Sequence, residues 1–225
     1  MSTSPLQSIQ IATSEQCEYA VIWLHGLGAS GHDFEPIVPE LHLPEKPGVR
    51  FVFPHAPIRP ITVNGGATMR GWYDITSMDF GSRQQDNAGI LESAGYVEQL
   101  IEVEIAQGIL PQNILLAGFS QGGAIALYTA ITTAHKLGGV LALSTYLPIQ
   151  DMALASLNDH AQTLPVFMGH GQYDDVIDIV HAEQSLKTLQ DAGIHVQWHT
   201  YPMAHSVNAE EIGDIASWLK SQLGL

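Results

Sequence analysis

The chain has 225 residues, of which 45% are hydrophobic and only 14% are charged. Its 8 basic and 23 acidic residues give a net charge of −15, which excludes charge-driven binding to nucleic acid or to an anionic membrane surface. Cys17 is the only cysteine, so no internal disulfide can form and the fold needs no oxidising compartment.

The N-terminus and the hydropathy of the chain favour a cytoplasmic protein. Residues 1–16 lack the basic and apolar regions of a secretory signal. No apolar run reaches the roughly 18 residues that a membrane span requires, so no integral membrane segment is expected. We find no repeat, linker or low-complexity segment, and residues 1–225 are therefore expected to form a single domain.

Short apolar segments alternate with amphipathic ones along the chain. Strands are expected at residues 9–12, 19–24, 50–54, 113–117, 138–144, 165–169 and 196–201. Helices are expected at residues 34–41, 87–107, 124–134, 178–192 and 208–223, the last with a capping box formed by Asn208 and Glu211. Most strands are continuous apolar runs, which predicts an α/β fold with a mainly parallel sheet covered by helices on both faces.

Residues 58–86 follow no clean period and are interrupted by prolines and glycines. This pattern predicts a long loop, and such loops are uncommon in compact domains unless they have a function. Apolar residues within the segment, among them Trp72 and Ile75, indicate either a lid or pocket wall, or packing on the core.

Ser120 lies in the segment Gly118-Phe119-Ser120-Gln121-Gly122, between an apolar strand and a largely apolar helix. A Gly-x-Ser-x-Gly segment in this position is typical of the nucleophile elbow, a strained strand-to-helix turn of serine hydrolases. Glycines two positions either side of the serine remove side chains that would crowd the turn. The combination of strand, turn and helix favours Ser120 as a nucleophile over a chance match.

A serine nucleophile needs a base, and the base needs an acid that fixes its tautomer. In this fold the acid and then the base follow the serine along the chain. His205, in the loop after the final strand, is the best placed of the 11 histidines. Asp174 and Asp175 both follow the preceding strand, and their positions leave the choice of acid open. Asp178 is expected to cap or begin a helix.

The oxyanion formed in acyl transfer needs N–H donors. Gln121, directly after the serine, is expected to supply one from its backbone, and Leu27 in the loop after an early strand is expected to supply the other. The same loop matches a dinucleotide fingerprint, Gly26-x-Gly28-x-x-Gly31. That alternative is disfavoured because no acidic residue ends the next strand to hold a ribose.

No metal site is predicted. His195 and His199 are four residues apart on an expected strand, where they would share a face, but no third ligand accompanies them.

Together these motifs resemble the phospholipase/carboxylesterase family of α/β-hydrolases, which includes carboxylesterases and acyl-protein thioesterases. The resemblance extends over about residues 20–215. Residues 201–205, from the end of the last strand into the loop after it, are similar to those of bacterial members. The matching positions are residues 24–28, 54–57, 72–74, 118–123, 143–144, 147–148 and 170–171, with Asp174 and His205.

The resemblance implies an α/β-hydrolase fold without a separate cap domain and a catalytic triad of Ser120, Asp174 and His205. It implies hydrolysis of short- to medium-chain acyl esters or thioesters, including lysophospholipids or S-acylated proteins, without a cofactor. It also implies a homodimer. By the same resemblance, three apolar residues correspond to positions around the acyl group: Trp72, Ile75 and Leu147.

Two other functions fit the same fold: a non-catalytic ligand-binding protein and a peptidase. Non-catalytic members of hydrolase folds usually lose part of the triad, whereas Ser120, Asp174 and His205 are all present here. A peptidase would have to cleave amides as well as esters.

Overall fold

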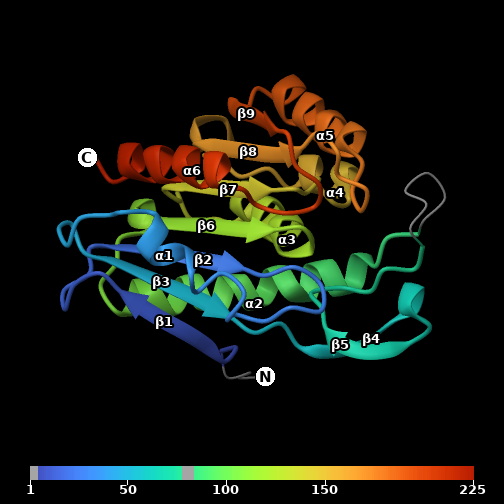
Figure 1. Cartoon of the computed structure of the whole chain (residues 1–225), viewed down its shortest axis with the longest axis horizontal. Coiled ribbons are helices and arrows are strands. Elements are labelled where there is room, and N and C mark those ends of the chain that lie inside the picture. Colours follow the sequence, from blue (N-terminus) through green and yellow to red (C-terminus); the bar gives the residue numbers. More distant parts are fainter. Residues whose placement is uncertain (1–4, 78–83) are drawn as a thin grey trace.

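A seven-stranded sheet runs through the protein, with helices on both of its faces (Figure 1). The computed structural model describes residues 5–77 and 84–225. The sheet has the strand order β1-β3-β2-β6-β7-β8-β9, and every neighbouring pair is parallel except β1 with β3. Its strands are β1 (Ser8–Ala12), β2 (Tyr19–Leu24), β3 (Val49–Pro54), β6 (Ile114–Phe119), β7 (Gly139–Leu143), β8 (Val166–Gly171) and β9 (Val196–Tyr201). The predicted α/β class and mainly parallel sheet are confirmed.

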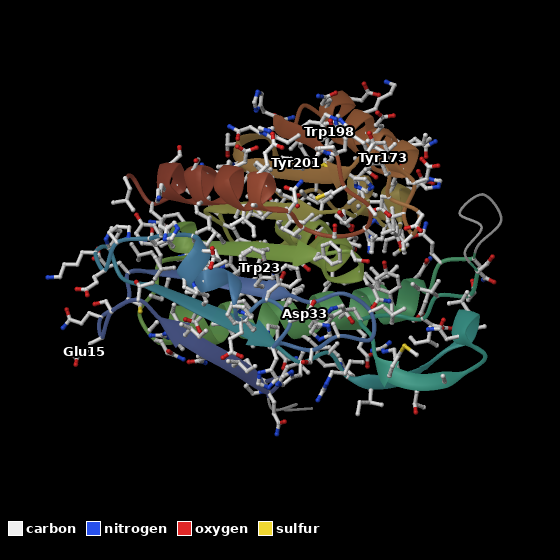
Figure 2. All side chains as sticks on the ribbon, viewed as in Figure 1. Glu15, Trp23, Asp33, Tyr173, Trp198 and Tyr201 are labelled. Carbon is white, nitrogen blue, oxygen red and sulfur yellow. The ribbon has the colours of Figure 1, made fainter. Side chains whose placement is uncertain are left out.

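Both faces of the sheet are buried because successive side chains of a strand point to opposite sides. On β2, Ala20 and Ile22 pack with residues of the helices on one face, and Val21 and Trp23 pack with those on the other. Trp23 lies in the interior of the molecule (Figure 2). This two-sided burial explains why the strands read as continuous apolar runs.

The helices divide between the two faces. Those that contribute to the core on the face of Ile22 include α2 (Asn87–Ala106), α3 (Gln121–Thr132), α4 (Gln150–Ala155) and α5 (Ile179–Asp191), and those on the face of Trp23 are α1 (Ile37–Glu40) and α6 (Ala209–Gln222). Short 3-10 helices occupy Thr62–Asn64, Pro111–Asn113 and Ala161–Thr163. Among the described residues, none of these helices is both long and apolar enough to cross a membrane.

The first and last helices agree with the prediction only in part. Within residues 34–41, where a short helix kinked or begun around Pro36 is expected, the helix starts directly after Pro36 and has four residues. At α6, Asn208 accepts a hydrogen bond from the Glu211 N–H as expected, at 2.9 Å. The reciprocal half of the capping box is wrong, since the Glu211 carboxyl has no hydrogen-bond partner among the described residues.

The segment expected to be one long loop contains a small hairpin. Residues Ile58–Ile61 form β4 and Ala67–Arg70 form β5, which pair antiparallel as a two-stranded sheet away from the main one (Figure 1). Residues 78–83 of the predicted loop lie outside the described part of the chain. The later residues 72–75 lie against the start of α3, where the Gln121 side chain holds them.

The carboxyl ends of the strands bring the predicted site residues together. The register pairs Leu24 of β2 with Gly118 of β6, and Gly171 of β8 with Tyr201 of β9. Side chains that follow these strands therefore emerge along one edge of the sheet, where ligands bind in open α/β folds.

Candidate active site

Ser120 occupies the turn between β6 and α3 in a strained conformation. Its φ is 55° and its ψ is −124°, in a region that non-glycine residues rarely adopt. Two hydrogen bonds hold the turn: the Ser120 N–H donates to Leu143 O at 2.9 Å, and the Thr145 hydroxyl donates to Ser120 O at 2.7 Å. The strain turns the Ser120 side chain to the end of the sheet, as the elbow motif predicts.

The two glycines of the elbow are required by close backbone contacts. A Cβ on Gly118 would lie 2.5 Å from the backbone of Gly122, and a Cβ on Gly122 would collide with the carbonyl oxygens of Leu24 and His25. The helix start therefore lies directly against the end of β2. This contact places the Ser120 turn beside the loop that contains Leu27.

A continuous chain of hydrogen bonds joins Ser120, His205 and Asp174. The Ser120 hydroxyl lies 2.9 Å from His205 Nε2, and His205 Nδ1 lies 2.7 Å from Asp174 Oδ2. Because an ionised carboxylate only accepts hydrogen bonds, the imidazole carries its proton on Nδ1 and Nε2 is free to accept from the serine. The Phe119 ring packs on His205 at a centroid distance of 4.7 Å and limits its rotation.

Hydrogen bonds stabilise the ionised form of Asp174. Its Oδ1 accepts backbone N–H groups of Val176 and Ile177 at 2.9 and 2.8 Å, and Oδ2 accepts from His205. Burial by itself would raise the pKa of Asp174, but these hydrogen bonds outweigh it and lower the pKa below its usual value. Asp175 is exposed, so the structure brings Asp174 and not its neighbour to the histidine. Tyr173, before them, lies on the surface (Figure 2).

His170 is a second histidine beside the same carboxylate. Its Nε2 lies 2.8 Å from Ile177 O and 3.4 Å from Asp174 Oδ2, so an N–H at Nε2 faces both acceptors. The side chain is completely buried, and this burial lowers its pKa. A neutral His170 on β8 therefore holds the loop that contains Asp174 through its hydrogen bond to Ile177 O. The sequence placed His170 among the positions that match the family but predicted no role for its side chain.

The loop after β2 is fixed by His25. Its Nδ1–H donates to Gly26 O at 2.7 Å, and its Nε2 accepts from the Ala56 N–H at 3.1 Å. Burial lowers the pKa of His25 to about 4, which keeps it neutral in this tautomer. Because the Gly26 carbonyl and the Leu27 N–H point in opposite directions from one trans peptide plane, the bond at Gly26 O also fixes the direction of the Leu27 N–H.

Leu27 and Gln121 both line the cavity to which Ser120 is exposed. The sequence predicted only a backbone role for Gln121, but its side chain also contributes. Its carbonyl oxygen accepts from the Trp72 N–H at 2.7 Å, and its amide donates to Tyr73 O at 2.6 Å. The first residue of α3 therefore holds the segment that forms the opposite wall of the site.

The cavity at Ser120 has a volume of about 210 Å³. Its wall is mostly apolar, and the polar Ser120 and Gln121 lie together on it. Apolar and aromatic residues make up most of the rest of the wall: Leu27, Val63, Tyr73, Ile75, Tyr146, Val176 and Ile177. A pocket of this kind suits an acyl group whose carbonyl carbon is presented to the serine.

Of the three predicted acyl-site residues, only Ile75 lines this cavity. Trp72 is completely buried in the core and its indole N–H donates to His25 O at 2.8 Å, so it supports the site from beneath. Leu147 lines a separate cavity of about 670 Å³, whose described lining residues include neither Ser120 nor His205. Tyr73, one of the apolar residues expected to form a pocket wall or to pack on the core, does line this cavity. Tyr146 and Val176 were not singled out from the sequence, because nothing in their spacing distinguishes pocket walls from core.

The glycines of the alternative nucleotide motif have structural reasons. Gly28 has a φ of 79°, and a Cβ on Gly31 would collide with the Phe53 carbonyl of β3. The loop does not lead into a long helix, since the next helix is the four-residue α1. These contacts explain the glycine spacing without a nucleotide.

Within residues 5–77 and 84–225, no group of three or more His, Cys, Asp or Glu side chains is arranged to hold a metal ion.

The fold and the arrangement of the strand-end residues are those of an α/β-hydrolase. Residues 7–223 match the phospholipase/carboxylesterase family, and the chain belongs to this family. It is accordingly an enzyme, a carboxylic-ester hydrolase.

Relatives from fungi and plants agree with this assignment. Acyl-protein thioesterase 1 of Cryptococcus neoformans is 38% identical, with 99% of this chain and 100% of the relative covered. Carboxylesterase SOBER1 of Arabidopsis thaliana is 34% identical with 90% of each covered, and its crystal structure superposes with a TM-score of 0.86 at 32% identity over 91% of this chain and 99% of the relative. The expected likeness to bacterial members in particular is not supported by these relatives.

A further solved structure supports the fold over nearly the whole chain. Acyl-protein thioesterase 2 of Zea mays superposes with a TM-score of 0.83 at 27% identity, covering 97% of this chain and 100% of that one. The predicted family and α/β-hydrolase fold are thus confirmed.

Proposed function

We propose that the protein is a serine carboxylesterase that hydrolyses short- to medium-chain acyl esters or thioesters, with Ser120 as its nucleophile. The observation that carries the proposal is the chain of hydrogen bonds from Asp174 through His205 to Ser120, at the wall of an apolar cavity. Serine hydrolases of unrelated folds share this arrangement of acid, base and nucleophile.

In the first half of the reaction, Ser120 attacks the acyl carbonyl carbon and His205 takes its proton at Nε2. Asp174 keeps the imidazole in the tautomer that accepts this proton and stabilises the imidazolium that results. The backbone N–H groups of Leu27 and Gln121 bind the oxyanion. Collapse of the intermediate leaves an acyl group on Ser120, and His205 returns the proton to the departing alcohol or thiol.

In the second half, water attacks the acyl-enzyme with His205 again as base, and a carboxylic acid leaves. Each proton taken from a nucleophile is returned to a leaving group, so the cycle needs no cofactor. The small apolar cavity favours simple acyl chains over large polar acyl groups. Relatives named acyl-protein thioesterase and carboxylesterase support thioesters and esters as the classes of substrate. Hydrolysis of S-acylated proteins and of lysophospholipids remains a prediction. The cytoplasmic location and the homodimer remain predictions.

Hydrolysis of p-nitrophenyl butyrate and of a butyryl thioester by the wild type and by Ser120→Ala tests the proposal. We expect Ser120→Ala to lower kcat by roughly 10⁴-fold or more and to abolish labelling by a fluorophosphonate. Wild-type protein with no Ser120-dependent turnover and no labelling would contradict the proposal and favour a binding protein. Cleavage of matched amides at a comparable rate would favour a peptidase.

A further inference from the structure

Two buried tyrosines meet at the wall of the cavity beside Ser120. The hydroxyls of Tyr73 and Tyr146 are hydrogen-bonded to each other at 2.7 Å, and the residues are only 3% and 6% exposed. Tyr73 comes from the segment after the β4–β5 hairpin, and Tyr146 follows β7. The contact therefore joins two parts of the chain that lie 73 residues apart.

Tyr146 contributes to the walls of two different cavities. One is the apolar cavity of about 210 Å³ that contains Ser120, and the other is the cavity of about 670 Å³ that Leu147 and Ile149 also line. The larger cavity is markedly more polar, with side chains that include Gln85, Asn87, Gln150 and Gln184. Tyr146 therefore lies between the apolar cavity and the polar one, and its partner Tyr73 lines the apolar side.

Hydrogen bonds hold the backbone of Tyr73 and the residues on either side of Tyr146. Tyr73 O accepts a hydrogen bond from the Gln121 side chain at 2.6 Å. Beside Tyr146, the Thr145 hydroxyl donates to Ser120 O at 2.7 Å, and the Leu147 N–H donates to Ser185 Oγ at 2.9 Å. With both segments anchored, the hydroxyl bridge has little freedom to open. Its polar atoms are hydrogen-bonded, so it closes an apolar cavity without an unpaired buried hydroxyl.

We propose that the Tyr73–Tyr146 pair closes the acyl cavity towards its polar neighbour and thereby sets the longest acyl chain that the enzyme accepts. This inference rests on the proposed esterase function, because it takes the apolar cavity as the acyl site. A methylene group is similar in size to a water molecule, which occupies about 30 Å³ of the liquid, so a cavity of about 210 Å³ holds roughly seven such groups. Chains much longer than this would have to displace the pair.

The test compares p-nitrophenyl hexanoate with p-nitrophenyl laurate in the wild type, Tyr146→Phe and Tyr146→Ala. We expect the wild type to favour hexanoate in kcat/KM. Tyr146→Ala opens the wall, and the ratio of laurate to hexanoate kcat/KM should rise about tenfold or more. Tyr146→Phe removes only the hydroxyl bridge, and its ratio should rise by a smaller factor.

Tyr128 on α3 supplies a matched control. It is as buried as Tyr146, at 5% exposure, but is absent from the described linings of both cavities. Tyr128→Ala should lower stability and activity without changing the ratio between the two esters. An unchanged ratio in a folded Tyr146→Ala protein overturns the inference, as does a wild type that hydrolyses laurate as fast as hexanoate.

A binding measurement separates failure of this inference from failure of the proposed function. In the Ser120→Ala background, the rise in Tm caused by methyl hexanoate and by methyl laurate reports the cavity without turnover. We expect laurate to stabilise Ser120→Ala/Tyr146→Ala more than Ser120→Ala, with hexanoate stabilising both about equally. If no Ser120-dependent turnover exists, the esterase proposal fails while this comparison still decides whether the pair limits chain length. Equal laurate shifts in the two proteins would overturn it.

Discussion

Asp174 and Glu211 are two buried carboxyl groups near the end of β8 that differ in their hydrogen-bond donors and in their charge. Asp174, in the loop after the strand, receives hydrogen bonds from His205 and from two backbone N–H groups. Glu211, in the first turn of α6, is completely buried against Gly169 of the same strand, and its carboxyl oxygens have no hydrogen-bond partner among the described residues.

The difference in partners produces opposite pKa shifts. The donors around Asp174 lower its pKa in spite of burial. Burial raises the pKa of Glu211 to about 8, with a smaller contribution from the negative charge of Asp214. Burial alone therefore does not determine the charge of a carboxyl group here; the number of donors aimed at it does. Asp174 is therefore ionised at neutral pH, whereas Glu211 is mainly protonated.

The largest expected effect is that of Asp174→Asn. An asparagine has one acceptor oxygen, so it cannot serve both His205 and the N–H groups of Val176 and Ile177, and the imidazole loses its tautomer control. We expect kcat on p-nitrophenyl butyrate to fall roughly 10³- to 10⁴-fold with little change in KM. Asp175→Asn is the matched control and should stay within about twofold. The reverse order of the two variants would show that Asp175 is the acid.

His170→Ala should have a smaller effect that acts through Asp174. Loss of the Nε2–H removes the bond to Ile177 O, and the Asp174 loop is then held less firmly. Because misplacement of a reacting group by about 1 Å costs on the order of 10²-fold, we expect kcat to fall by about 10- to 100-fold, with KM nearly unchanged. His170→Asn, which retains an N–H donor, should recover part of this loss. Equal activity of wild type and His170→Ala would mean that His170 serves packing alone.

Glu211→Gln should leave activity nearly unchanged and alter the pH dependence of stability. The folded state of the wild type keeps a proton that the unfolded chain releases near pH 4.5, so its stability falls as pH rises from about 4.5 to about 8. The glutamine variant lacks this loss. Above pH 8 we expect it to be more stable than the wild type by on the order of 2 kcal/mol, and below pH 4.5 the two should be similar.

Urea unfolding at pH 5 and pH 9 measures this difference. If Glu211→Gln is more stable than the wild type by the same free energy at pH 5 and at pH 9, protonation of Glu211 is not the cause of the difference. The inferred contrast in protonation between Asp174 and Glu211 would then be wrong.

The two strands of the β4–β5 hairpin were not predicted from the sequence. Ile58–Ile61 contains Pro60 and lacks a clear alternation of apolar and polar residues, so it did not read as a strand. Its pairing with Ala67–Arg70 depends on contacts across a turn rather than on a local pattern. By contrast, β9 at Val196–Tyr201 was predicted with its observed bounds, because β-branched and aromatic residues dominate a short segment that ends before Pro202.

The parallel sheet, the elbow at Ser120 and the chain order of the candidate nucleophile, acid and base could be predicted from the sequence, because apolar periodicity, glycine spacing and chain order are local or one-dimensional signals. Three features could be seen only in three dimensions: Asp174 lies at His205 while Asp175 is exposed, Trp72 is buried in the core rather than on the cavity wall, and Tyr73 pairs with Tyr146. The same is true of Glu211, which is buried against Gly169 with no hydrogen-bond donor to its carboxyl group in residues 5–77 and 84–225. These outcomes depend on which side chains meet across the sheet edge, and such meetings follow from packing in three dimensions.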